Sequence, residues 1–299
     1  MSYITIDRIV KDYGNNRGLF DVSFKVEKGQ TIGIVGINGA GKTTLLRLLM
    51  GFIHQDQGSC MINGMDCWRN SEEIKKLIAY IPGEINFPAL RYGDDFIKVQ
   101  AQFWHEKDLT PTKDLTRRLQ LDTTAILKRM SKGMKQKTAI ATAFIPNNDI
   151  LIFDEPTTGL DPLMRNVFLD VIKREKEKGR TIIMSSHMFE EVEDCCDKII
   201  LLKDGRILSE INIEDIRHNK EKKYKIEFNK AEDYENFKKE KITIRGEKPK
   251  YNQLSVVVHD EQINTLFSIL SNYEIKYITE IKTTLEEYFL EEYKKGEQK

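Results

Sequence analysis

Several features that would assign this chain to other classes of protein are missing from its sequence. No apolar run reaches the roughly 20 residues that a membrane-spanning helix needs, and the N-terminal segment has no signal-peptide core. We therefore expect the chain to stay in the cytosol. The 47 basic residues equal the 47 acidic ones, so the sequence has no bulk electrostatic attraction for nucleic acid or anionic lipid. We expect no nucleic-acid partner, and any recognition of phosphate must be local.

Cysteine is scarce and is not spaced for metal binding. No C-x-x-C pair and no histidine at metal-site spacing accompanies the four cysteines, Cys60, Cys67, Cys195 and Cys196. This spacing argues against a zinc site or a disulfide framework and indicates reduced thiols in the core or at the surface. The rest of the composition is ordinary for a globular protein, with 40% hydrophobic and 31% charged residues. The length suits one large core and a smaller second domain.

The hydrophobic pattern of the first two thirds of the chain is typical of an α/β fold. Residues 3–10 and 19–26 are rich in β-branched and aromatic residues around a turn, which predicts an antiparallel hairpin. Short apolar runs, typical of buried parallel strands, alternate with helical patterns. These runs cover residues 31–35, 149–153, 181–185 and 198–202. A helical insert is expected at about residues 84–145, with Asp122-Thr123 as one plausible helix cap.

The composition changes near residue 220, where lysine and glutamate become frequent. Strand-like and helix-like segments alternate beyond it, at residues 224–228, 231–239, 254–258, 262–273 and 275–281. We therefore expect residues 1–218 to form the main domain and residues 219–299 a small α+β domain. The separate composition and mixed charge of the second domain favour a regulatory or dimer-stabilising role.

A glycine-rich segment between a predicted strand and a predicted helix is the first motif that carries chemistry. Residues 36–44 read Gly-Ile-Asn-Gly-Ala-Gly-Lys-Thr-Thr, which matches the phosphate-binding loop pattern. Its glycines let backbone N–H groups converge on phosphates, and the following helix N-terminus favours negative charge. We expect Lys42 to contact the β- and γ-phosphates of a nucleotide and the Thr43 hydroxyl to bind Mg²⁺. The expected nucleotide ligands are Gly36, Asn38, Gly39, Ala40, Gly41, Lys42, Thr43 and Thr44.

A second motif is an apolar strand that ends in two acidic residues, Asp154 and Glu155. This arrangement delivers one carboxylate to a metal ion and the other to an attacking water. Acidic residues also terminate buried strands for structural reasons, so this motif alone leaves both interpretations open. The order of the remaining motifs decides between them. Ser-Lys-Gly-Met-Lys-Gln at residues 131–136 precedes the carboxylates, whereas Pro-Thr-Thr-Gly-Leu-Asp at 156–161 and Ser-Ser-His at 185–187 follow them.

With these motifs in this order, the chain from about residue 4 to residue 208 resembles the ABC ATPase family. The resemblance implies a P-loop NTPase core with an N-terminal antiparallel β subdomain and a helical insert, and an ATPase that uses ATP and Mg²⁺. It also implies that Asp154 holds Mg²⁺ through water and that Glu155 is the general base. His187 would bridge the γ-phosphate and the attacking water, and Lys42 completes the expected catalytic set.

The same resemblance implies that two chains share each nucleotide. Ser131 and Gly133 correspond to signature residues that contact the γ-phosphate held by the other subunit, and Asp161 would couple the two sites. Lys132 stands where the first signature glycine is usual and Met134 follows Gly133, a variant similar to that of drug- and antibiotic-exporting members.

Two residues at the edge of the expected site allow more than one interpretation. Tyr13 stands where family members stack an aromatic ring on adenine, although a tyrosine in such a loop also serves for packing. The family usually has a glutamine after a Tyr-hydrophobic-Pro segment, but residues 80–84 read Tyr-Ile-Pro-Gly-Glu. Glu84 either reaches the metal in place of that glutamine or is a surface glutamate. Residues 85–92, which are apolar and contain a proline, suit either partner docking or packing under the helical insert.

The resemblance implies a subunit that hydrolyses ATP to power export through a separate integral membrane permease. It would pair with a second copy of itself or with a homologous ATPase, on the inner face of the cell membrane. One alternative is an importer ATPase whose C-terminal domain is regulatory, although residues 284–289 resemble exporter subunits more closely. The other alternative is a soluble ABC-type ATPase of translation or DNA repair.

Overall fold

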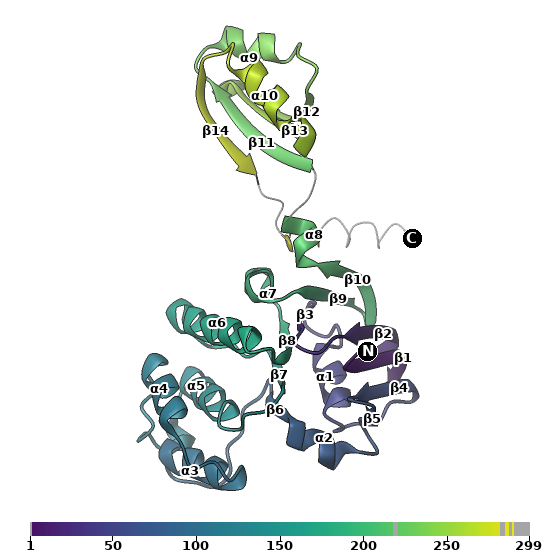
Figure 1. Ribbon diagram of the computed structural model, residues 1–299, viewed down its shortest axis with the longest axis vertical. Coiled ribbons are helices and arrows are strands. Elements are labelled where there is room, and N and C mark those ends of the chain that lie inside the picture. The colour runs from purple at the N-terminus through teal and green to yellow at the C-terminus, as the bar shows by residue number, and fades with distance from the viewer. Residues whose placement is uncertain (1, 218–220, 282–284, 287–288, 290–299) are drawn as a thin grey trace. The chain divides into compact units, whose positions relative to one another are not determined.

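The computed structural model describes residues 2–217, 221–281, 285–286 and 289. The chain forms two compact units, the first ending at Ile213 and the second beginning at Glu214 (Figure 1). The domain boundary expected after residue 218 falls on residues 218–220, which lie outside the described residues, as do residues 284, 287 and 288 of the 284–289 segment. Among the helices of the described residues, none combines the length and the apolar character needed to cross a bilayer.

The first unit is built on a sheet of six strands in the order β10-β9-β3-β8-β7-β6. Their bounds are β3 (Thr31–Val35), β6 (Ile78–Ile81), β7 (Ile150–Asp154), β8 (Thr181–Ser186), β9 (Lys198–Lys203) and β10 (Arg206–Asn212). All neighbours pair in parallel except β10, which runs antiparallel to β9. Every residue of β3, β7 and β8 is buried, which explains their uninterrupted apolar sequences. The segments that follow these three strands leave the sheet at the same edge.

A second, antiparallel sheet has the strand order β2-β1-β4-β5. It contains β1 (Ile4–Asp12), β2 (Gly18–Val26), β4 (Gln57–Ile62) and β5 (Met65–Asp66), and it confirms the predicted hairpin. Helix α1 (Lys42–Leu49) lies between the two sheets and packs its leucines into a core shared with both (Figure 1). This packing holds the N-terminus of α1 at the carboxyl edge of the parallel strands.

The remaining helices of the first unit connect its strands. They are α2 (Ser71–Leu77), α3 (Gly93–Phe103), α4 (Thr110–Arg118), a 3₁₀ turn (Leu127–Arg129), α5 (Lys132–Ala143), α6 (Pro162–Glu177) and α7 (Phe189–Cys195). Helix α8 (Ile213–Arg217) follows β10, and the chain passes from the first unit to the second within it. The expectation of a helix cap at Asp122 was wrong. The Asp122 carboxylate instead accepts hydrogen bonds from the backbone and hydroxyl of Thr124, a local turn that competes with helix formation.

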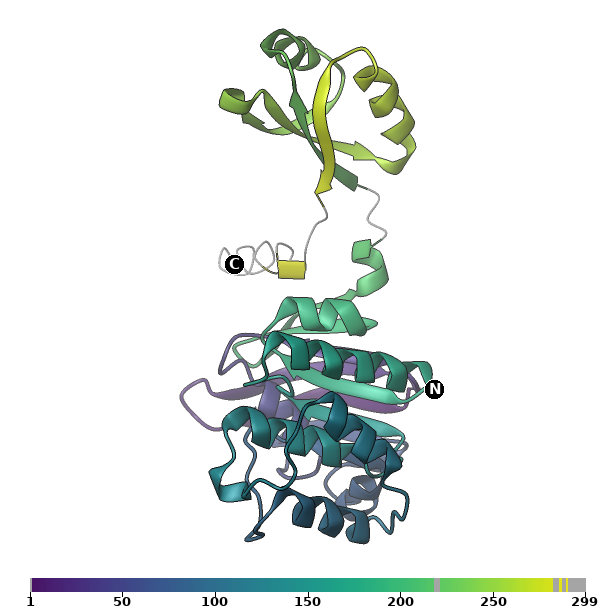
Figure 2. The ribbon, with the colours of Figure 1, turned by 90° about the vertical axis from the view of Figure 1, so that its left-hand side faces the viewer.

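The second unit has the element order β-α-β-β-α-β and an antiparallel sheet in the order β12-β13-β11-β14 (Figure 2). Its elements are β11 (Glu221–Phe228), α9 (Ala231–Phe237), β12 (Thr243–Lys248), β13 (Gln253–His259), α10 (Ile263–Leu270) and β14 (Ile275–Ile281), with 3₁₀ turns at Pro249–Tyr251 and Asp260–Gln262. This is the ferredoxin-like arrangement. Residues of both helices share one apolar cluster with the strands, including Phe228, Phe237 and Val256. The unit therefore has its own core.

Candidate functional site

The loop between β3 and α1 forms a cradle of the kind that holds phosphate groups. A Cβ atom on Gly36 would lie 2.5 Å from the carbonyl oxygen of Leu202, so only glycine fits there. Gly41 caps α1 with a φ of 106°, a backbone conformation that favours glycine. The loop opens on a cavity of about 570 Å³ lined by Tyr13, Arg17, Gly18, Asn38, Gly39, Ala40, Gly41, Lys42, Thr43, Thr44 and Glu155. Most of the predicted nucleotide ligands therefore gather around one cavity at a helix N-terminus.

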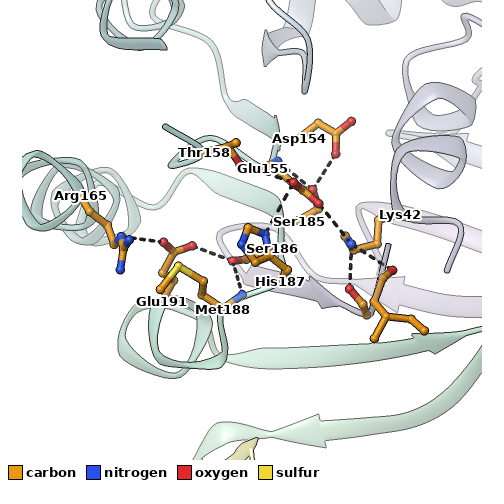
Figure 3. A network of polar contacts seen from close by, with 12 residues as sticks. Lys42, Asp154, Glu155, Thr158, Arg165, Ser185, Ser186, His187, Met188 and Glu191 are labelled. Atoms are coloured by element: carbon orange, nitrogen blue, oxygen red, sulfur yellow. Dashed lines mark hydrogen bonds and ion pairs between the residues drawn. The ribbon is translucent and has the colours of Figure 1, made fainter. Parts of the chain in front are cut away.

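Lys42 is folded back across this loop. Its side chain is only 5% exposed, and Nζ donates a hydrogen bond to the Gly36 carbonyl oxygen at 2.8 Å. Nζ also lies 3.2 Å from Oε1 of Glu155 (Figure 3). A buried ammonium needs such partners because its desolvation is costly. A phosphate group entering the cavity would compete with Glu155 for this charge.

The two predicted carboxylates lie at the end of β7 but have different surroundings. Asp154 is 1% exposed. Its Oδ1 accepts a hydrogen bond from Ser185 at 2.7 Å, whereas Oδ2 is buried without a hydrogen-bond partner. A buried, unpartnered carboxylate oxygen is a hard ligand that fits a divalent cation such as Mg²⁺. Burial, followed by the charge of Asp154, raises the pKa of the neighbouring Tyr80 to about 12.

Glu155 turns away from the strand direction and faces the cavity. Its φ of 48° is in the left-handed region, a conformation that non-glycine residues adopt at a cost and that clusters at functional sites. Its backbone N–H donates to Ser185 Oγ at 2.9 Å, so Ser185 holds both acidic residues. His187 Nδ1 lies 3.6 Å from Glu155 Oε2 (Figure 3). The structure thus brings Lys42, Glu155 and His187 together.

Ser131, Gly133 and Asp161 are among the predicted residues that do not line this cavity within their own chain, and the others are Gly36, Glu84, Asp154 and His187. Ser131 Oγ accepts a hydrogen bond from the Met134 N–H and caps α5, and Asp161 caps α6 through the Met164 N–H. A Cβ on Gly133 would lie 2.7 Å from the Gly159 carbonyl oxygen. The start of α5 is therefore packed on the segment that follows Glu155.

Tyr13 and Glu84 lie at the periphery of the candidate site. Tyr13 is 54% exposed and lines the cavity. Glu84 is exposed, whereas its neighbour Gly83 faces the metal candidate, since a Cβ there would lie 3.1 Å from Asp154 Oδ2. Adenine stacking by Tyr13 and metal binding by Glu84 stay predictions.

Sequence reasoning gave no role to several residues that build the site. Ser185 holds both carboxylates, and Gln136 donates a hydrogen bond to the Pro156 carbonyl oxygen at 2.6 Å. Both residues belong to sequence motifs, and this membership was the only feature of the sequence that could have indicated their roles. The ion pair of Arg165 with the buried Glu191 had no signal in the sequence, because this contact joins two different helices.

Comparison with known proteins identifies the family. Residues 19–158 match the family described as ABC transporter. The ABC transporter ATP-binding protein NatA of Bacillus subtilis is 34% identical over 201 residues, which cover 63% of this chain and 79% of that protein. The chain belongs to the ABC transporter ATP-binding family.

Other ABC proteins agree with this assignment. The Nod factor export ATP-binding protein I of Paraburkholderia xenovorans is 31% identical over 215 residues, covering 69% of this chain and 70% of that protein. A solved ATP-binding subunit of an ABC transporter has a TM-score of 0.65 at 29% identity, covering 72% of this chain and 92% of that one. As a member of this family, the protein binds ATP with Mg²⁺ and hydrolyses it.

Proposed function

We propose that this ABC ATPase powers export through a separate integral membrane permease and that Glu155 is its general base. The observation that carries the catalytic part is the position of the Glu155 carboxylate. It lies 3.2 Å from Lys42 and 3.6 Å from His187, at the cavity of the phosphate-binding loop. A base must lie within reach of the water and the phosphate at once, and this arrangement supports such a role.

In the proposed reaction, the loop N–H groups and Lys42 hold the phosphates of ATP. Thr43 and Asp154 would hold Mg²⁺, and the ion would supply positive charge that offsets the charge of the phosphates. Water attacks the γ-phosphorus, the bond to the bridging oxygen of ADP breaks, and Glu155 accepts the proton of the water. His187 orients the water and the γ-phosphate. Phosphate and ADP are the products.

A second subunit completes each site in this proposal. Ser131 is exposed at the N-terminus of α5, and helix N-termini bind anions. Because Ser131 and Gly133 do not line the described cavity of their own chain, we assign them to the γ-phosphate held by the other subunit. Asp161, at the start of α6, would then lie near the junction of the two chains.

Replacement of Glu155 by Gln tests the catalytic part. We expect kcat to fall about 100-fold or more, as for loss of a general base, while ATP binding is retained. The variant should accumulate as an ATP-bound dimer in size-exclusion chromatography. Turnover at the rate of the unchanged protein would rule out Glu155 as the base.

An apolar cavity in the first unit supports docking of the permease. Its volume is about 570 Å³, and its lining includes Phe52, Tyr80, Phe87 and Phe103. Phe103 is 70% exposed. Part of the 85–92 segment, including Ile85 and Phe87, lines the same cavity. We propose that an apolar segment of the permease enters it at the inner face of the membrane.

The permease contact is tested by Phe103→Asp in the full-length chain. A charge at this surface should reduce the amount of integral membrane protein that co-purifies from native membranes, while ATP hydrolysis by the purified chain is unchanged. Phe267→Asp is the matched control, because Phe267 is also exposed, at 47%, but belongs to the second unit. Equal recovery with both variants would contradict docking at this cavity.

We propose export as the direction of transport because of the signature variant with Lys132 and Met134 and because of the similarity to a protein named for Nod factor export. Identification of the co-purifying membrane protein tests it. Association with a permease that depends on a substrate-binding protein would favour import instead.

A further inference from the structure

An ion pair between a buried glutamate and a partly exposed arginine lies behind the loop that carries His187. Glu191, on α7, is 1% exposed, and its Oε1 lies 3.3 Å from Nε of Arg165 on α6. The two atoms are within ion-pair distance but not aligned as a hydrogen bond. A buried carboxylate is costly unless it is compensated. Glu191 is therefore held at one position by its partners.

The second oxygen of Glu191 reaches the loop itself. Oε2 accepts a hydrogen bond from Ser186 Oγ at 2.6 Å, and the same Oγ accepts a hydrogen bond from the Met188 N–H at 2.9 Å (Figure 3). Ser186 and Met188, which flank His187, are thus linked through the Ser186 hydroxyl. This hydroxyl is in turn hydrogen-bonded to the buried carboxylate of Glu191. Between Ser186 and Met188, the His187 side chain is 50% exposed and faces Glu155.

We infer that Glu191, held by Arg165, is a positioning residue that aims His187 at Glu155 and at the reacting γ-phosphate. The inference rests on the catalytic role proposed above for His187. Helix α6 begins at Pro162, directly after Asp161. Because Arg165 belongs to α6, its ion pair with Glu191 also connects the His187 loop to the helix that follows Asp161. Loss of the carboxylate charge leaves Arg165 uncompensated and loosens the loop.

The test uses Glu191→Gln in the purified full-length chain. The amide keeps the shape and an acceptor for Ser186 but removes the charge that Arg165 faces. We expect kcat to fall about tenfold, since small misplacements of a catalytic group have effects of at least this size. KM for Mg²⁺-ATP should stay within about twofold, because the phosphate-binding loop is untouched. Glu190→Gln, an identical change at an exposed position one residue earlier, is the control and should leave both constants unchanged.

A double-mutant cycle separates positioning from a general loss of structure. If Glu191 acts through His187, the variant with both Glu191→Gln and His187→Ala is no slower than His187→Ala alone. If the two effects on kcat multiply, or if Glu191→Gln changes KM as much as kcat, the inference is overturned. Should Glu191→Gln unfold below the assay temperature, Ser186→Ala, which removes one hydroxyl, carries the same expectations.

The cycle also distinguishes this inference from the proposed function. Unchanged kcat in His187→Ala would contradict the role of His187 and the inference with it. A slow His187→Ala variant beside a Glu191→Gln variant with unchanged kcat would overturn the inference alone.

Discussion

The two units of the chain use charged residues in opposite ways. In the first unit Lys42, Asp154 and Glu191 are at most 5% exposed, and their contacts meet at the carboxyl edge of a parallel sheet. In the second unit the ion pair of Lys230 and Glu274 has both side chains 59% exposed, a setting in which ion pairs contribute little to stability. Buried charge is costly, and three of the four buried charged side chains described in the first unit lie at this edge. The fourth, Glu175, pairs with Lys178 and Arg180 at the end of α6.

The sharpest test of this contrast compares two lysines. Lys42→Ala should weaken ATP binding about 100-fold or more, because loss of one partner in a buried charge contact costs several kcal/mol. Lys230→Ala should leave nucleotide affinity and melting temperature unchanged. Equilibrium titration with a fluorescent ATP analogue and a thermal scan measure both. Equal affinities in the two variants would remove the distinction between the units.

Two glycines test whether packing is equally demanding in the two units. A Cβ on Gly133 meets the Gly159 carbonyl oxygen at 2.7 Å, whereas a Cβ on Gly246 meets nothing closer than Ser255 Cβ at 3.7 Å. Gly133→Ala should therefore lower the free energy of unfolding by about 1–3 kcal/mol, and Gly246→Ala should change it by less than about 0.5 kcal/mol. Urea denaturation measures both, and a reversed order would contradict this account of the packing.

The smallest expected effect concerns two tyrosines whose pKa values are both raised to about 12. Burial is the main cause for Tyr80, whereas the hydrogen bond to Glu240 is the main cause for Tyr273. A phenol with a raised folded-state pKa contributes stability below the unfolded pKa of about 10 and loses it as pH rises toward about 12.

Replacement of Tyr273 by Phe removes this titration from the second unit. The free energy of unfolding should then fall less steeply between about pH 9 and about pH 11 than in the unchanged chain. Urea denaturation across this range measures the difference. An unchanged slope would mean that the hydrogen bond to Glu240 does not control the titration of Tyr273.

Prediction from sequence was most successful where local pattern and burial agree. Strands β3, β7 and β8 are buried on both faces, so their apolar runs are visible without the structure. Strands β4 and β12 were missed because their sequences, Gln-Gly-Ser-Cys-Met-Ile and Thr-Ile-Arg-Gly-Glu-Lys, show no such run. Strand β12 is an edge strand with mostly exposed residues, and pairing with β13 decides its conformation.

The phosphate-binding loop could be recognised without the structure, because glycine spacing, a buried strand and a following helix are local properties. The order of motifs that identifies the ABC family is likewise visible in the sequence. Three features became visible only in the folded chain: Ser185 holds both carboxylates, Glu155 lies between Lys42 and His187, and Glu191 is bonded to the His187 loop. The contacts of Ser185 and Glu155 join residues distant in sequence, and they form because parallel strands deliver their carboxyl ends to one edge of the sheet. The contact of Glu191 with Ser186 is local, but the ion pair with Arg165 that holds Glu191 joins two helices.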